Sequence, residues 1–184
     1  MLVVRPGRRH GKMVLKLVDP SSAILSEKVP AFDFKNPPVN SLELARDLLE
    51  TLIDRKCIGL SANECGLPYR VSVFRTEDPL VMFNPRIIDE TTEHIILEET
   101  CASNTNMIVK IKRPKIIKVR YQDATGEFHT EKFIGITARA ILHELDHLNG
   151  INYTKRAHPV HLSRAQNKKK HLDRQVAREL KQAI

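Results

Sequence analysis

The chain has 184 residues, 41% of them apolar, which is enough to bury one ordinary hydrophobic core. No apolar run approaches the roughly 20 residues of a membrane-spanning helix, so we expect no membrane partner. The 30 basic side chains outnumber the 22 acidic ones, and the formal charge of +8 favours an anionic partner.

The number of cysteines indicates the redox state of the compartment in which the protein works. There are three of them, Cys57, Cys65 and Cys101, and the odd number is accompanied by no signal-peptide pattern. This usage is typical of a reducing, cytoplasmic environment, where thiols stay free for metal ligation or packing. An organelle and the cytoplasm of a virus-infected cell stay open as locations.

The first predicted element is a helix in the N-terminal third. Residues 1–13 are basic and contain Pro and Gly, so we interpret them as an extension ahead of one domain over residues 14–160. Asn40 followed by Glu43 is a capping-box pattern that begins a helix reaching about Lys56. Its expected apolar face is formed by Ala45, Leu48, Leu49, Leu52 and Ile53.

Short β-like runs follow this helix. They lie at residues 69–74, 80–83, 87–88 and 94–97. Residues 115–121 and 127–134 flank Asp123-Ala124-Thr125-Gly126, which predicts a hairpin. Helical periodicity returns at residues 136–149 and ends at Gly150. This order of a helix, antiparallel strands and further helices predicts an α+β fold.

The C-terminal segment, residues 161–184, is predicted to be a basic helix. From residue 164 onward it holds seven basic side chains against two acidic ones. Apolar residues recur in it at helical spacing, at Leu162, Ala165, Leu172, Val176 and Leu180. One face of the helix is therefore expected to pack while the other presents positive charge.

The stretch LHELDHLNG, residues 142–150, carries the strongest chemical signal. His143 and His147 are four residues apart, so on a helix both imidazoles face one ion, and Glu144 reaches beside it. A metal site of this kind needs a third ligand. Tyr153 stands where one class of zinc protease has its third histidine, so that class is excluded; Glu179 and Cys101 stay open as candidates.

Three stretches together resemble the peptide deformylase family. They are Cys57-Ile58-Gly59-Leu60-Ser61-Ala62-Asn63-Glu64-Cys65-Gly66, Glu98-Glu99-Thr100-Cys101-Ala102-Ser103 and residues 142–150. The family motifs read approximately G-x-G-x-A-A-x-Q, E-G-C-x-S and Q-H-E-x-D-H-L-x-G, in the same order. The resemblance covers about residues 14 to 155. It implies antiparallel strands wrapped around a central metal-binding helix.

The resemblance also implies a reaction and a metal. Cys101, His143 and His147 would hold one divalent ion, iron(II) in the native enzyme, with zinc or nickel as replacements. Glu144 would act as general base and acid in hydrolysis of the N-formyl group from the N-terminal methionine of newly made polypeptides, releasing formate. The substrates would be N-formylmethionyl nascent peptides, and the basic C-terminal helix suggests the ribosome and its RNA as a further partner.

Supporting roles are likewise implied by the resemblance. The backbone N–H of Ala102 and the side chain of residue 64 would stabilise the oxyanion, and backbone groups would bind the substrate. The expected substrate-binding residues are Ile58, Gly59 and Thr100. The residues expected to brace the site are Glu99, Arg113 and Asp146.

The residue at position 64 departs from the family pattern, because Glu64 replaces the glutamine of the first motif. An ionised carboxylate does not donate a hydrogen bond, and its charge opposes an oxyanion nearby. Two hypotheses follow. The chain is an active deformylase with an adapted donor, or it is a catalytically weak or re-purposed protein of the same fold that retains its metal.

Overall fold

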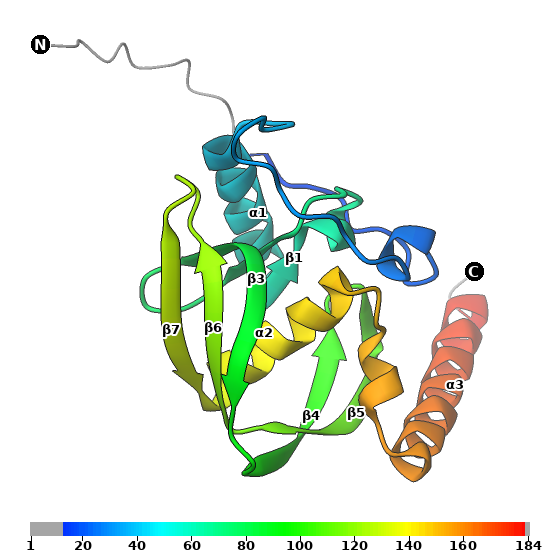
Figure 1. Cartoon of the computed structure of the whole chain (residues 1–184). Helices are drawn as coiled ribbons and strands as arrows, with labels where there is room; N and C mark the ends of the chain where they lie inside the picture. Colours follow the sequence, from blue (N-terminus) through cyan, green and yellow to red (C-terminus); the bar gives the residue numbers. More distant parts are fainter. Residues whose placement is uncertain (1–12, 183–184) are drawn as a thin grey trace, which may run out of the picture.

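The computed structural model describes residues 13–182, so the predicted N-terminal extension lies outside the described residues except for Met13. Figure 1 shows the arrangement of the elements. The helices are α1 (Ser41–Arg55), α2 (Gly135–Leu148) and α3 (Pro159–Gln182), with 3-10 turns η1 (Ala23–Leu25), η2 (Ala62–Cys65) and η3 (Tyr153–Arg156). The strands are β1 (Gly59–Ser61), β2 (Val71–Phe74), β3 (Leu80–Glu90), β4 (His94–Cys101), β5 (Asn104–Pro114), β6 (Ile116–Gln122) and β7 (Phe128–Ile134).

Two antiparallel sheets surround α2. One has the order β1-β2-β3-β6-β7, and the other is the β4-β5 hairpin. Helix α2 lies between them and contacts strands of both, as Figure 1 shows. The predicted α+β class, with antiparallel strands around a central helix, is therefore confirmed.

Helix α1 begins as its sequence predicts. The Asn40 side chain accepts hydrogen bonds from the backbone N–H groups of Leu42 and Glu43 at 3.0 and 3.1 Å. Leu48 is fully buried, but the prediction for Ile53 was wrong, because this side chain is 58% exposed. Consecutive helical positions differ by about 100°, so Ile53 turns away from the core that Leu52 enters.

Strands β4 and β5 place the second sheet over one side of α2. Strand β5 was not predicted, although its buried side chains, Val109, Ile111 and Arg113, alternate as a strand requires. One of the three is charged, which breaks the apolar alternation that marks a strand in sequence. The runs 80–83 and 87–88 form a single strand, β3, that passes through Asn84 in a left-handed conformation (φ 52°).

Helix α3 only partly matches its prediction. Ala165 is buried against β5, but Leu172, Val176 and Leu180 are 38%, 53% and 62% exposed. Helix α3 thus packs on β5 only through its first turns, and the rest of its expected apolar face is exposed to solvent. None of the helices within residues 13–182 is long and apolar enough to cross a membrane.

Candidate metal centre and active site

Helix α2 and the end of β4 bring three metal-ligating side chains together. His143 and His147 lie one turn apart on α2, with 3.2 Å between their Nε2 atoms. The Sγ atom of Cys101, the last residue of β4, lies 3.3 Å from Nε2 of His147. All three residues are buried, so the set predicted from sequence is assembled in the fold.

The donor set fits a divalent ion. With metal–sulfur and metal–nitrogen bonds of about 2.3 and 2.1 Å, tetrahedral geometry separates neighbouring ligand atoms by roughly 3.3 to 3.6 Å, close to the distances found here. Burial raises the pKa of the Cys101 thiol, so binding of an ion displaces its proton. Nδ1 of His143 lies 3.1 Å from Oε2 of Glu99, which leaves Nε2 for the ion.

Glu99 is the centre of the bracing interactions. Arg113 donates to its two carboxylate oxygens at 2.7 and 2.9 Å, and Arg139 donates to one of them. Burial opposes ionisation of Glu99, but hydrogen bonds from His143 and Arg113 lower its pKa to about 2. Arg113 also donates to Asp146 at 2.8 Å. The expected contact of Glu99 with Arg113 is present, and Asp146 joins it.

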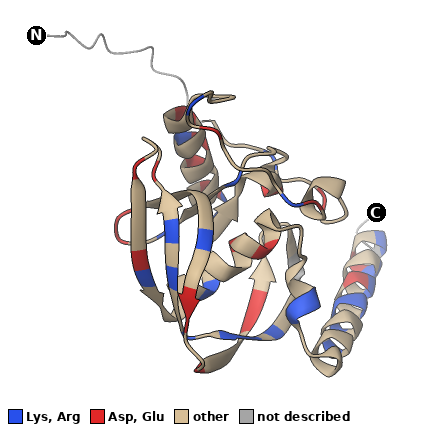
Figure 2. Cartoon of the chain, viewed as in Figure 1, with Lys and Arg blue, Asp and Glu red and all other residues tan. Residues whose placement is uncertain are grey.

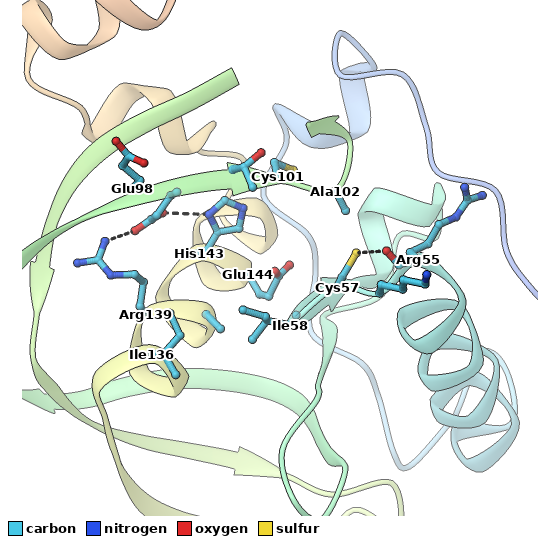
Figure 3. A pocket seen from close by; sticks show the side chains of 15 residues that line it. Arg55, Cys57, Ile58, Glu98, Cys101, Ala102, Ile136, Arg139, His143 and Glu144 are labelled. Carbon is cyan, nitrogen blue, oxygen red and sulfur yellow. Dashed lines mark hydrogen bonds and ion pairs between the residues drawn. The ribbon is translucent and has the colours of Figure 1, made fainter. Parts of the chain in front are cut away.

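Glu144 faces a pocket of about 370 Å³, large enough for the end of a peptide. In Figure 3, His143 and Glu144 rise from α2, Cys101 and Ala102 lie across from them, and Ile58 closes another side. The Oε2 atom of Glu144 is buried and has no hydrogen-bond partner among the described residues. A Cβ on Gly59 would lie 2.8 Å from Oε1 of Glu144, so this position has room only for glycine.

Glu64 lies deep beside the metal ligands. Its Oε2 accepts hydrogen bonds from the N–H and hydroxyl of Ser61, each at 3.1 Å, and its Oε1 accepts from Cys101 at 3.1 Å and Ser103 at 3.2 Å. Burial opposes ionisation, but neighbouring His147 and the bonds from Ser61 and Cys101 lower the pKa of Glu64 to about 2. In this geometry the side chain is a hydrogen-bond acceptor.

The two buried glutamates differ in protonation. Burial, and then the charge of Glu64, raise the pKa of Glu144 well above its usual range. Two carboxylates this close do not both ionise readily, so without an ion the proton resides on Glu144. A divalent ion beside them lowers the cost of ionising both.

The remaining sequence-predicted residues lie where expected. Ile58, Gly59, Thr100 and Ala102 all line the pocket. Sequence reasoning missed Ser61 and Ser103 as partners of Glu64, and it gave Arg139 no role. Arg139 lies four residues before His143, on the same helix face, and this spacing was the signal available. Glu179 is exposed on α3, and the ligand clusters within the described residues leave it out.

Comparisons with known proteins identify the family of the chain. The chain matches the polypeptide deformylase family over residues 12–163. The peptide deformylase of Wolbachia pipientis wMel is 36% identical over 149 residues, covering 71% of this chain and 83% of that protein. That of Rhizobium meliloti is 33% identical over 146 residues, covering 76% and 81%.

Solved structures give the same result. A peptide deformylase from Synechococcus elongatus in complex with actinonin has a TM-score of 0.79 at 27% identity, with 88% of this chain and 90% of that chain covered. A Met-Ala-Ser-bound class I type b enzyme from Acinetobacter baumannii has a TM-score of 0.74 at 27% identity, with 79% and 99% covered.

The fold and the family define a metal-dependent hydrolase, in which Cys101, His143 and His147 form a possible metal-binding triad. More specifically, the chain belongs to the polypeptide deformylase family, as its three motifs predicted. The activity of this family, removal of the N-formyl group from the N-terminal methionine of nascent peptides, is favoured over a re-purposed protein.

Metal content tests the ligand set. We expect Cys101→Ala to weaken zinc binding on the order of 100-fold or more, because even loss of an outer partner costs 10- to 100-fold. Cys65→Ala, which removes a half-buried thiol outside the cluster, should bind zinc as the unmodified protein does. The measurement is chelator competition at equilibrium. Equal affinity in the two variants would show that Cys101 is not a ligand.

Proposed function

We propose that Cys101, His143 and His147 hold the catalytic ion and that Glu144 transfers the protons of deformylation. The observation that carries the proposal is the position of Glu144, which has a buried, unpartnered Oε2 and lines a peptide-sized pocket beside the ligand cluster. Met-Ala-Ser, bound to the Acinetobacter baumannii enzyme, is what remains when a formyl group leaves a formylated tripeptide. Formylated nascent peptides are therefore the substrates of this chain.

The chain's own residues suffice for the proton transfers. A divalent ion at the cluster supplies a Lewis acid that polarises the formyl carbonyl and makes water a stronger nucleophile. Glu144 accepts a proton from the attacking water and donates it to the leaving amine, so that formate and a free N-terminus result. Glu99 holds the ring of His143 in place throughout. We assign iron(II) as the native ion, with zinc or nickel as substitutes.

The substrate lies extended along the pocket. Backbone groups of Ile58 and Gly59 pair with the peptide main chain from one side, and the carbonyl of Thr100 from the other, in the manner of strand addition. Such contacts do not depend on side chains, so Thr100 serves as well as glycine. The N–H of Ala102 donates to the developing oxyanion.

The rate of formate release tests the role proposed for Glu144. We expect Glu144→Ala to reduce turnover of formyl-Met-Ala-Ser by the nickel-loaded protein about 10²- to 10⁴-fold, the usual contribution of a positioned acid–base group. Zinc or nickel content should stay unchanged. Glu77→Ala, which removes an exposed carboxylate from a loop, is the matched control. Retention of activity in Glu144→Ala would refute the role given to this residue.

The effect of the Glu64 carboxylate on the rate can be measured by replacing this residue. Replacing it with an amide removes a negative charge near the oxyanion and adds a donor, so we expect Glu64→Gln to raise kcat about tenfold or more. Glu64→Ala removes the charge without adding the donor and separates the two effects. A fall in kcat in Glu64→Gln would mean that the carboxyl donates its own proton during the reaction.

The basic helix α3 suits contact with ribosomal RNA. Figure 2 shows Lys and Arg positions, in blue, along its length, and the exposed ones include Arg174, Arg178 and Lys181. Phosphate contacts by such side chains release counterions and supply affinity without base recognition. We infer that α3 brings the enzyme to the ribosome, and we place the reaction in the cytoplasm, where the three cysteines stay free.

Ribosome co-sedimentation tests the helix. We expect the combined substitution of Arg174, Arg178 and Lys181 by Gln to weaken binding and to lower its salt dependence by close to three counterions. Lys118→Gln/Lys132→Gln, a pair on adjacent strands of the large sheet, removes two positive charges away from α3 and is the control for the two-charge variant Arg174→Gln/Arg178→Gln. Truncation after residue 160 should weaken binding further. Unchanged binding by the truncated chain would exclude α3 as the contact.

A further inference from the structure

A second cavity, of about 480 Å³, lies at the C-terminal end of α2 and shares no lining residue with the peptide pocket. Leu142, Leu145, Asp146 and Asn149 of α2 form one of its walls. At 100° per residue these positions point to a different side of the helix from His143 and Glu144. The other walls come from β3 of the five-stranded sheet, from β4 and β5 of the two-stranded sheet, from the turn η3 and from Arg70.

The lining of this cavity is strongly basic. Its charged side chains are Arg70, Arg86, Lys112, Arg113 and Arg156 against Glu90 and Asp146. In Figure 2, blue segments on β3 and η3 flank the end of α2. The lining has five basic side chains against two acidic ones, a larger excess than the 30 against 22 of the whole chain.

The carboxylate of Asp146 is paired with two arginines that also line the cavity. It accepts from Arg113 at 2.8 Å and from Arg156 at 2.7 Å. Within residues 13–182, Arg86 and Lys112 form no ion pair or side-chain hydrogen bond, although both line the cavity. Two cations thus reach the cavity without a paired carboxylate; Glu90, which forms no ion pair within the described residues either, places one negative charge on the same lining against the three cations Arg70, Arg86 and Lys112.

Arg70 adds a third cation that no carboxylate balances. Its guanidinium donates to the carbonyl oxygens of Leu148 and Pro85 at 3.0 and 3.2 Å and to Oδ1 of Asn149 at 3.0 Å. These acceptors are neutral, and they include the terminal carbonyl of α2. Arg70 therefore offsets the negative end of the helix dipole, which would otherwise repel an anion from this cavity.

We propose that this cavity binds a phosphate group. Arginine forks present paired N–H donors that match phosphate oxygens, and a lysine adds a point charge. A dianion satisfies Arg86 and Lys112 together, whereas a single carboxylate leaves one positive charge unbalanced. The volume exceeds that of free phosphate, and Ile87, Pro114 and Leu142 offer apolar wall for an attached group. The ligand class is a phosphate ester: a free monoester, whose dianion supplies both charges, or a nucleic acid strand, in which two diester groups of one charge each supply them.

Calorimetric titration of the nickel-loaded protein, with the peptide pocket blocked by actinonin, tests the proposal. The probes are inorganic pyrophosphate, adenosine 5′-phosphate and a ten-nucleotide single-stranded RNA. We expect Arg86→Gln/Lys112→Gln to weaken binding of at least one probe tenfold or more. Lys118→Gln/Lys132→Gln carries the same charge change on exposed positions outside the cavity and should bind as the unmodified protein does.

The outcomes separate the sources of phosphate. Binding of pyrophosphate or the nucleotide, lost in the cavity variant alone, supports a site for a free phosphate ester. Binding of RNA alone, lost in the same variant, supports a phosphodiester as the occupant. Equal affinities in the two double variants, or no saturable binding of any probe at physiological salt, would overturn the proposal. Both variants change exposed side chains, so thermal melting should be unchanged and folding defects excluded.

Discussion

The buried carboxylate of Glu99 is the interaction on which the site depends. It joins β4, β5 and α2 by accepting from Arg113, Arg139 and His143. Removing one partner of a buried pair typically costs about 3 to 5 kcal/mol, because the other charge is left uncompensated. With Asp146 the buried part of the cluster contains two carboxylates and two guanidinium groups, so its charges balance, and the half-exposed Arg156 adds a third guanidinium on Asp146.

This balance explains how a small sheet holds Cys101, the proposed metal ligand, in a fixed position. The β4-β5 hairpin is only two strands, and such a hairpin is marginal alone. Arg139 from α2 also donates to the carbonyls of Ile95 and Ile111, one on each strand. The helix that carries the two histidines therefore also fixes the strand that carries Cys101.

Much of this arrangement could be predicted from sequence, because the i, i+4 spacing of His143 and His147 dictates a shared helix face. The third ligand could not be derived from spacing, since Cys101 reaches the site by the packing of β4, and only the resemblance identified it. Strand β5 stayed unrecognised because Arg113 occupies an inward position. Ser61 and Ser103 were missed because their importance lies in contacts with Glu64 that no local pattern encodes.

Glu64 shows how a departure at one position is accommodated by its neighbours. A buried carboxylate needs donors, and Ser61, Ser103 and the Cys101 thiol provide them. Once an ion is bound, the Cys101 thiolate no longer donates, so the charge of Glu64 is balanced by the ion and the two serines. The extra negative charge strengthens the hold on a cation while it weakens the attraction for an oxyanion. Metal affinity and stabilisation of an oxyanion are thus expected to respond in opposite directions to the charge at this residue.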